Sequence, residues 1–353
     1  MEYEHGGDIY SRQIDADFST NLSPLGLPEG VKEAVGQGIF LCGQYPDSQC
    51  RALKKALAVC HQVSEDWIIC GNGAAELIFN LAFGLKPQKA IVLSPTFSEY
   101  GSALSAAGCE ITYFDLKEEE GFALKEEEFC RFLEKEGNQG EIVFLCNPNN
   151  PTGLASDRLA VKKIAEVCRR KEMVLAVDEC FCDFLPEPKQ SSILPYLKEF
   201  PNTVVLKAFT KTYALAGIRL GYGICADTKI LEQMERVRQP WSVSVLAQEA
   251  GIAALKEKHY VEKVRTLISQ EREFLKSGLE NLGFFVWDSR ANYLFFKDAN
   301  HRENWLYKKL LEQRVLIRSC GNYRGLDGHY CRICIKTRKE NEEFLQILKA
   351  VLD

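Results

Sequence analysis

The 353-residue sequence has no apolar run that approaches the ~20 residues needed for a helix to cross a bilayer. It also lacks an apolar segment near its start, where Glu2, Glu4, His5 and Asp8 are found, so no secretory signal is expected. Excess positive charge is missing too: 44 basic residues stand against 49 acidic ones, a formal net charge of −5. That balance argues against nucleic-acid and anionic-membrane partners. We expect a cytoplasmic protein.

Cysteines, in contrast, are numerous, and the 14 of them are scattered along the chain. Many lie inside apolar runs, as Cys146 does, which is typical of small buried hydrophobes kept reduced in the cytosol. The pairs Cys180/Cys182 and Cys331/Cys334 lie in strand-like sequence, whereas zinc sites use turn-forming loops. We therefore predict no metal site and no redox role for these cysteines.

Short apolar runs indicate buried strands at residues 90–93, 141–146, 173–177 and 203–206. Between two of them, residues 160–168 carry apolar side chains at the spacing of one helix face. Strands that alternate with helices predict an α/β domain with a mostly parallel sheet. Ligands of such sheets bind at the carboxyl ends of the strands. The length of the chain favours a division into two domains.

The most informative stretch is residues 210–222, where Lys211 precedes Arg219 by eight residues at the end of an apolar run. A desolvated amine held beside fixed positive charge suits Schiff-base formation. A cofactor with an aldehyde and a phosphate would use Lys211 for its carbon and Arg219 for its phosphate, and pyridoxal 5′-phosphate is such a cofactor. Taken alone, the pair is also compatible with a surface lysine and arginine that flank a turn.

Two other predicted strands end in candidate cofactor ligands. A glycine turn leads into a predicted helix, so the N–H groups of Gly73, Ala74 and Ala75 form an anion site that we assign to the cofactor phosphate. After the next strand, we choose Phe97 over Tyr100 as the ring that stacks on a flat heterocycle, although a core phenylalanine fits the sequence equally well.

Polar side chains also follow the strands in the middle of the chain. Residues 147–153 are rich in proline and asparagine, which indicates a tight turn, and Asn150 would present an amide donor to a phenolate oxygen. Asp178 ends a very apolar strand, where a carboxylate is costly unless it is paired. A protonated pyridine nitrogen would be a suitable partner.

These motifs stand in the order found in fold-type I pyridoxal-phosphate aminotransferases, which the chain resembles over nearly its whole length. The resemblance implies an α/β fold, with a large domain built on a mostly parallel mixed sheet flanked by helices and a smaller α+β C-terminal domain. It places Lys211 on the cofactor carbon, Asp178 at the pyridine nitrogen, Asn150 at the 3′ oxygen and Arg219 at the phosphate.

The same resemblance adds Thr210, Phe181 and Tyr45 to the cofactor site. Tyr45 is similar to the tyrosine that reaches the phosphate held by the other subunit, which implies a homodimer with active sites at the interface. Ala208 stands where many relatives carry serine or threonine, so one hydrogen bond to the phosphate is missing, worth about 1 kcal/mol. Phe181 stands where aminotransferases often place a tyrosine, as expected for the decarboxylase branch.

Both ends of the chain, at residues 5–26 and 316–332, resemble the threonine-phosphate decarboxylase family, a relative of the histidinol-phosphate aminotransferases. This resemblance implies decarboxylation of L-threonine O-3-phosphate to (R)-1-amino-2-propanol phosphate, for cobalamin biosynthesis. It places the substrate carboxylate on Arg332 and the substrate phosphate on Arg318. The other substrate contacts that it implies are His5, Gly6, Asn21 and Asn150.

The sequence leaves decarboxylation and transamination open, so an aminotransferase of the histidinol-phosphate type is the alternative. A ligand-binding protein without catalysis is a third reading, against which the intact Lys211 argues. We expect an N-terminal arm at residues 1–35 that contributes to the small domain and the cleft. The large cofactor-binding domain should span residues 36–250 and the small domain residues 251–353.

Overall fold

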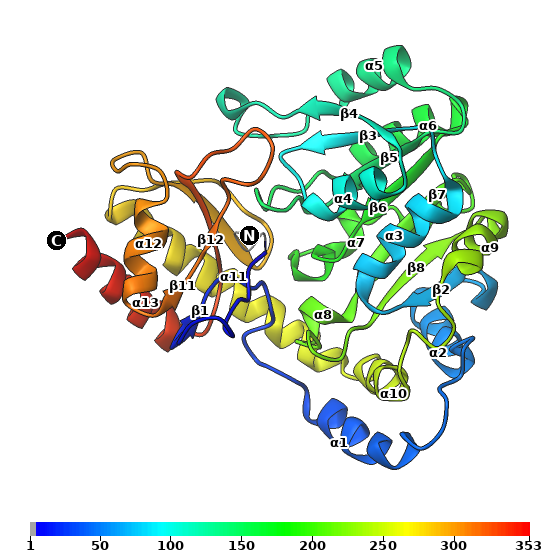
Figure 1. The fold of residues 1–353 in the computed structure, drawn as a ribbon, viewed down its shortest axis with the longest axis horizontal. Helices are drawn as coiled ribbons and strands as arrows, with labels where there is room; N and C mark the ends of the chain where they lie inside the picture. Colours follow the sequence, from blue (N-terminus) through cyan, green and yellow to red (C-terminus); the bar gives the residue numbers. More distant parts are fainter. Residues whose placement is uncertain (1–4) are drawn as a thin grey trace.

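A computed structural model describes residues 5–353 of the chain (Figure 1). The strands are β1 (Ala16–Asp17), β2 (Ile68–Gly71), β3 (Lys89–Ser94), β4 (Glu110–Asp115), β5 (Ile142–Cys146), β6 (Val174–Asp178), β7 (Thr203–Ala208), β8 (Gly221–Cys225), β9 (Phe285–Val286), β10 (Tyr293–Lys297), β11 (Val315–Leu316), β12 (Arg318–Ser319) and β13 (Tyr330–Cys334). The α-helices are α1 (Glu29–Gly38), α2 (Arg51–His61), α3 (Gly73–Leu85), α4 (Ser98–Ala106), α5 (Glu126–Glu136), α6 (Arg158–Arg170), α7 (Pro188–Ser191), α8 (Phe209–Thr212), α9 (Thr228–Val237), α10 (Val245–Ala254), α11 (Lys258–Asn281), α12 (Trp305–Glu312) and α13 (Arg338–Leu352).

A seven-stranded sheet in the order β2-β8-β7-β6-β5-β3-β4 forms the centre of the larger part of the molecule. Its strands β7, β6, β5, β3 and β4 run parallel, and only β8 is antiparallel to both of its neighbours. The expected α/β fold with a mostly parallel mixed sheet is therefore confirmed. Because neighbouring parallel strands end at the same edge, the segments that follow β3, β5, β6 and β7 lie close together.

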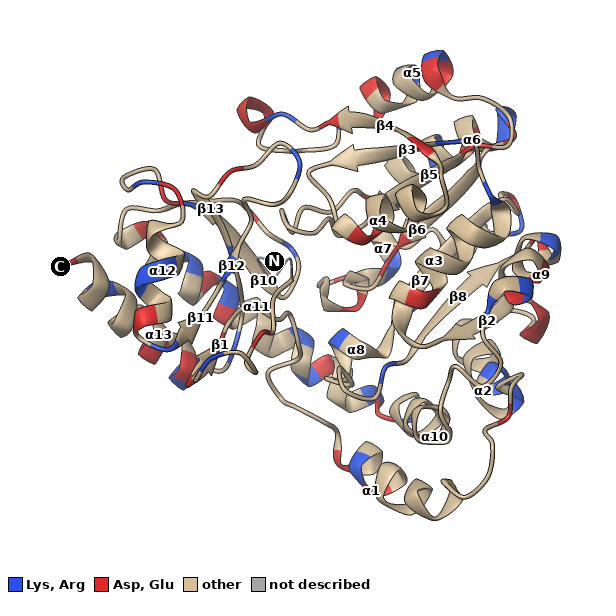
Figure 2. Ribbon diagram, viewed as in Figure 1, with Lys and Arg blue, Asp and Glu red and all other residues tan. Residues whose placement is uncertain are grey.

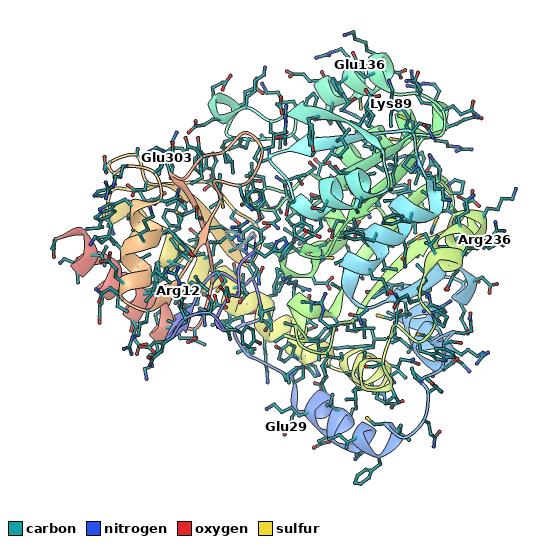
Figure 3. All side chains as sticks on the ribbon, in the orientation of Figure 1. Arg12, Glu29, Lys89, Glu136, Arg236 and Glu303 are labelled. Atoms are coloured by element: carbon teal, nitrogen blue, oxygen red, sulfur yellow. The ribbon has the colours of Figure 1, made fainter. Side chains whose placement is uncertain are left out.

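Both faces of this sheet are covered by helices and buried. Successive side chains of a strand point to opposite faces, so each strand contributes to both cores. Ile91 and Leu93 of β3 join a core formed with helices α2, α5, α6 and α10, whereas Ala90 and Val92 join a second core formed with α3, α4 and α9. In Figure 2 the strands of this sheet are mostly tan, and the blue and red segments that mark charged residues lie mainly on the outer turns and helices. The charged residues labelled in Figure 3, among them Glu136 and Arg236, lie at the periphery.

A smaller antiparallel sheet, in the order β12-β13-β10-β9, packs against α11 and α13. The N-terminal segment is tied to this part, because β1 pairs in parallel with β11 and the N–H of Cys334 donates to the carbonyl of Phe18 (2.8 Å). It also reaches the larger part, where the N–H of Ser23 donates to the carbonyl of Lys211 (3.0 Å). The segment therefore connects the two sheets on the side of Lys211.

The domain boundaries stay predictions, and residues 1–4 of the expected arm lie outside the described residues. The expected boundary at residue 35 falls within α1, and the one at residue 250 falls within α10; these two helices pack against each other. Within residues 5–353, no helix combines the length and the apolar character that a membrane crossing requires.

Candidate active site

A cavity of about 440 Å³ opens at the carboxyl ends of β3, β5, β6 and β7, opposite β12 and β13 of the smaller sheet. This volume is within the usual range for small-molecule sites. Most residues that the sequence placed in the site line the cavity: His5, Gly6, Asn21, Ala74, Ala75, Phe97, Asn150, Asp178, Phe181, Thr210, Lys211, Arg219, Arg318 and Arg332. The fold thus brings together residues from the two ends and the middle of the chain.

Two of the sequence-based site residues do not line the cavity. Gly73 lies behind it, at a positive φ of 78°, and a Cβ atom there would come within 2.5 Å of Arg219 Nη2. Glycine is therefore needed at this position for the guanidinium to reach its place. Tyr45 is 81% exposed and its ring packs on that of Trp241, with centroids 4.7 Å apart. Its expected role needs a second subunit, so a single chain does not test it.

Lys211 belongs to α8, a single helical turn directly after β7, and its amine faces the cavity. Burial, followed by the positive charge of Arg332, lowers the pKa of this amine to about 8. Within residues 5–353, Lys211 Nζ has no hydrogen-bond or ion-pair partner, and it lies 5.8 Å from the centroid of the Phe181 ring. The lowered pKa increases the fraction of the amine that is uncharged near neutral pH, which makes it a better nucleophile.

Asp178, the last residue of β6, is buried beneath the cavity. The phenol of Tyr100 donates to its Oδ2 (2.7 Å) and the N–H of Cys180 donates to its Oδ1 (3.0 Å). Burial, and then the negative charge of Asp178, raises the pKa of Tyr100 well above its ordinary value, so this phenol keeps its proton and acts as a donor. Phe97 lines the cavity, whereas Tyr100 stacks on Phe144 outside it.

The asparagines of the turn after β5 have different roles: Asn149 stabilises the turn, whereas Asn150 faces the cavity. The side chain of Asn149 is bound within the large part, where it accepts from Thr96 Oγ1 (2.7 Å) and donates to the Pro95 carbonyl (3.0 Å). Asn150 instead accepts at Oδ1 from Arg332 Nη1 and from the hydroxyl of Tyr323 (3.4 Å). With its oxygen engaged in this way, Asn150 can still offer its amide nitrogen as a donor to a ligand.

An anion site lies at the beginning of α3. Ala74 and Ala75 present the first turn of this 13-residue helix to the cavity, next to Arg219. Free N–H groups, the helix dipole and the guanidinium all favour a negative group there. Ala208 also lines this cavity without offering a side-chain donor, and Lys207 is turned away toward Asp183 (3.0 Å).

Two arginines of the small sheet face the other side of the cavity. Arg318 on β12 and Arg332 on β13 are directly paired across the antiparallel strands, and both are buried. Like charges opposite each other destabilise a sheet, so an anion between them would offset that cost. Arg332 Nη2 donates to the Ser19 carbonyl (2.9 Å), while its buried Nε has no partner among the residues described.

The N-terminal segment forms one edge of the cavity. Gly6 lies so close to Ser19 that a Cβ atom would come within 2.5 Å of the Ser19 carbonyl oxygen. His5 Nε2 is 3.2 Å from Oε1 of Glu99, a residue of α4 that also lines the cavity. Asn21 is buried, and its Oδ1 has no partner within the described chain.

Some lining residues were missed by the sequence reasoning: Ser19, Thr20, Glu99, Cys146, Cys180 and Tyr323. Cys146 ends β5 and Cys180 lies two residues after the end of β6, so their position at the end of a strand was a usable signal. Tyr323 lies in a segment that was singled out, but neither it nor Glu99 was given a role, because each role depends on a contact between distant segments.

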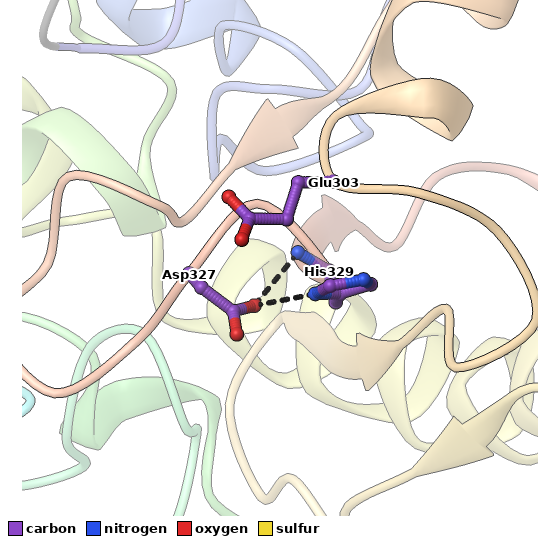
Figure 4. A group of neighbouring side chains, drawn as sticks. All are labelled: Glu303, Asp327 and His329. Atoms are coloured by element: carbon purple, nitrogen blue, oxygen red, sulfur yellow. Dashed lines mark hydrogen bonds and ion pairs between the residues drawn. The ribbon is translucent and has the colours of Figure 1, made fainter.

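A separate group of three side chains, Glu303, Asp327 and His329, lies in loops of the smaller part (Figure 4). Asp327 accepts from the backbone N–H of His329 and pairs with its Nδ1, both at 2.9 Å. Glu303 and Asp327 are exposed, and exposed acidic groups need no ion. All 14 cysteines are free, and both Cys331 and Cys334 are buried within β13.

The fold and the cavity define a fold-type I aminotransferase architecture. The family model for aminotransferase class I and II matches residues 16–348, so the chain belongs to this family. It is 40% identical to the threonine-phosphate decarboxylase of Salmonella typhimurium, over 99% of this chain and 96% of that protein.

Solved structures agree with this assignment. The histidinol-phosphate aminotransferase of Clostridium acetobutylicum has a TM-score of 0.88 at 30% identity, covering 96% of this chain and 99% of that one. The histidinol-phosphate aminotransferase of Sinorhizobium meliloti, solved with pyridoxal-5′-phosphate, has a TM-score of 0.83 at 20% identity, covering 97% and 92%. The second likeness shows the fold alone.

Proposed function

We propose that this protein is a pyridoxal-phosphate enzyme that decarboxylates L-threonine O-3-phosphate to (R)-1-amino-2-propanol phosphate. The observation that carries the proposal is the 40% identity to a threonine-phosphate decarboxylase over nearly the full length of both chains. The two neighbouring buried arginines of the cavity support it, because a phosphorylated amino acid brings both a phosphate and a carboxylate.

The cavity residues fit the cofactor. Lys211 offers a partner-free amine, and the beginning of α3 with Arg219 offers an anion site that only a glycine at position 73 permits. Asp178 offers a fixed carboxylate and Phe97 an aromatic face. When bound, pyridoxal phosphate withdraws electrons from the bonds at the substrate α carbon.

The protein's own contribution is to place charges and to handle protons. We assign Arg332 to the substrate carboxylate and Arg318 to the substrate phosphate, where a guanidinium can form paired hydrogen bonds. Lys211, with its pKa near 8, can hold or release a proton close to neutral pH. The N-terminal segment with His5, Gly6 and Asn21 covers the same cavity and helps to exclude water.

An aminotransferase of the histidinol-phosphate type is the second candidate. It is favoured by the TM-score of 0.88 and 30% identity to the Clostridium enzyme. Both reactions use the same cofactor residues, so the difference must lie in how the substrate is held. Aminotransferases often place a tyrosine at the position of Phe181. Phe181 lies beside Lys211 and has no hydroxyl, which supports the decarboxylase.

The test is to incubate the purified holoenzyme with L-threonine O-3-phosphate. We expect release of CO₂ and of an amino-alcohol phosphate without any keto-acid acceptor. Transfer of the amino group to 2-oxoglutarate with no release of CO₂ would identify the aminotransferase instead. A Lys211→Ala variant serves as the control for uncatalysed loss of CO₂.

We also infer a homodimer in which Tyr45 enters the partner's active site. Support comes from an apolar surface beside Tyr45, where Ile39 is 59%, Phe40 88% and Trp241 49% exposed. Exposed apolar groups gathered in this way mark interaction surfaces. Sedimentation should give twice the chain mass of 39.9 kDa. A Phe40→Asp variant should dissociate, and a monomeric wild-type protein with full cofactor would refute the inference.

A further inference from the structure

Tyr323 lies in the turn between β12 and β13, lines the cavity and is only 6% exposed. The backbone of this turn is held from within, because the N–H of Tyr323 donates to the Cys320 carbonyl and the N–H of Leu326 donates to the Tyr323 carbonyl (both 3.0 Å). It is also held by the large part, where Ser94 Oγ donates to the Arg324 carbonyl (2.9 Å). The backbone that carries Tyr323 is therefore held by both parts of the molecule.

The ring and the hydroxyl of Tyr323 are associated with different arginines, the ring with Arg318 and the hydroxyl with Arg332. The guanidinium carbon of Arg318 lies 5.3 Å from the ring centroid, within the range of a cation–π contact. The hydroxyl lies 3.4 Å from Asn150 Oδ1, the atom that also accepts from Arg332 Nη1. Tyr323 thus spans the distance between the Arg318 guanidinium and the acceptor shared with Arg332.

The contact with Asn150 leaves the hydroxyl available to a better acceptor. At 3.4 Å this bond is longer than the 2.5–3.0 Å of a well-formed O–H···O bond, and Arg332 already donates to the same oxygen. An anionic oxygen bound by Arg332 would be a stronger acceptor than the amide. The Tyr323 ring contacts the face of the Arg318 guanidinium, whose Nη1 donates to the Ser319 carbonyl (2.8 Å) and whose Nη2 donates to Asn322 Oδ1 (2.6 Å). An anion bound by Arg318 would therefore approach in the guanidinium plane.

We propose that Tyr323 is a specificity-determining residue that fixes the spacing of the two anion sites and donates its hydroxyl to the substrate at the Arg332 side. The proposal rests on the proposed function, because it assigns the two arginines to one substrate. The ligand class that it selects is a small amino acid carrying both a carboxylate and a phosphate ester. Compounds with only one of the two anions use only half of the arrangement.

Two substitutions separate the roles of the ring and the hydroxyl. Tyr323→Phe keeps the ring under Arg318 and removes only the hydroxyl, so we expect KM for L-threonine O-3-phosphate to rise about tenfold or more, while kcat stays within about threefold. Inhibition by inorganic phosphate, which uses the Arg318 side alone, should stay within about twofold in this variant. Tyr323→Leu removes the ring, and phosphate inhibition should then weaken by about fivefold or more.

The matched control is Tyr222→Phe, which removes a buried hydroxyl bonded to His61 (2.8 Å) away from the cavity. This control should change neither KM nor phosphate inhibition. Equal KM for Tyr323→Phe and wild type, or unchanged phosphate inhibition in Tyr323→Leu, would overturn the proposal. Cofactor content, read from absorbance, verifies that each variant is loaded.

A failure of the proposed function can be distinguished from a failure of this inference. If the wild-type holoenzyme releases no CO₂, binding of L-threonine O-3-phosphate and of inorganic phosphate can still be followed by the change in cofactor absorbance. The same order of affinities among wild type, Tyr323→Phe and Tyr323→Leu is expected in that titration. A binding profile unaffected by either substitution would refute the role of Tyr323 regardless of the reaction.

Discussion

Replacement of Tyr100 by phenylalanine tests how the buried carboxylate of Asp178 is held. The hydroxyl of Tyr100 donates to the side-chain carboxylate of Asp178 at 2.7 Å, and the N–H of Cys180 donates to the other oxygen of that carboxylate at 3.0 Å. The ring of Tyr100 is fully buried and stacks on Phe144, with centroids 4.9 Å apart. Phenylalanine keeps this packing, so the substitution removes a single donor.

The expected cost follows from the nature of the acceptor. A hydrogen bond to a charged group contributes about 1.5–3 kcal/mol, and a buried carboxylate that loses it keeps the desolvation penalty. We therefore expect the free energy of unfolding of the cofactor-free protein to fall by about 1.5–3 kcal/mol at pH 7. Asp178 is also held less firmly at the cavity floor, so we expect pyridoxal phosphate to bind about tenfold more weakly, an effect of about 1.4 kcal/mol.

The assay combines denaturant unfolding of the cofactor-free protein with a titration of cofactor absorbance. Tyr222→Phe is the control, because its hydroxyl bonds to His61, whose pKa burial lowers to about 4 and which is therefore neutral at pH 7. That variant should lose only about 0.5–1.5 kcal/mol and bind the cofactor normally. A Tyr100→Phe protein as stable as wild type, with unchanged cofactor affinity, would show that the Tyr100–Asp178 bond does not support the site.

Three further predictions concern the site and the buried ion pair that follows it. Ala208→Ser should tighten cofactor binding by about 1 kcal/mol, because it supplies a hydroxyl at a position where the cavity offers no side-chain donor. Absorbance titration measures this affinity. An affinity equal to that of the wild type would mean that the phosphate does not lie beside this residue. The rate at which cofactor-free protein combines with pyridoxal phosphate should rise through pH 8 as Lys211 loses its proton, and Arg332→Gln should move that inflection upward, since removal of a positive neighbour raises the pKa. Asp183→Asn should destabilise the protein by about 3 kcal/mol in denaturant unfolding, because it leaves the buried charge of Lys207 with Glu179 alone, at 3.9 Å; a change below 1 kcal/mol would contradict this.

The elements that the sequence predicted most accurately are those governed by local pattern. The expected run at residues 203–206 lies within β7 (Thr203–Ala208), and the glycine turn leads into α3, which ends at Leu85. Apolar alternation and turn residues are local properties, so they need no knowledge of distant contacts. The domain boundaries depend on packing between distant segments rather than on local pattern, so the expected division at residues 35 and 250 stays a prediction.

The same distinction applies to the site. The sequence by itself determined which side chains stand at strand ends, including Lys211 and Asp178, because a strand end is recognisable from the apolar run before it. Only the tertiary structure decided that Arg318 and Arg332 lie side by side, that Tyr100 donates to Asp178 and that Tyr323 joins the two halves of the cavity. Tyr100 and Asp178 are 78 positions apart, and Tyr323 and Asn150 are 173 apart. Contacts over such separations are set by strand order, register and packing of the whole chain, which local preferences along the sequence do not contain.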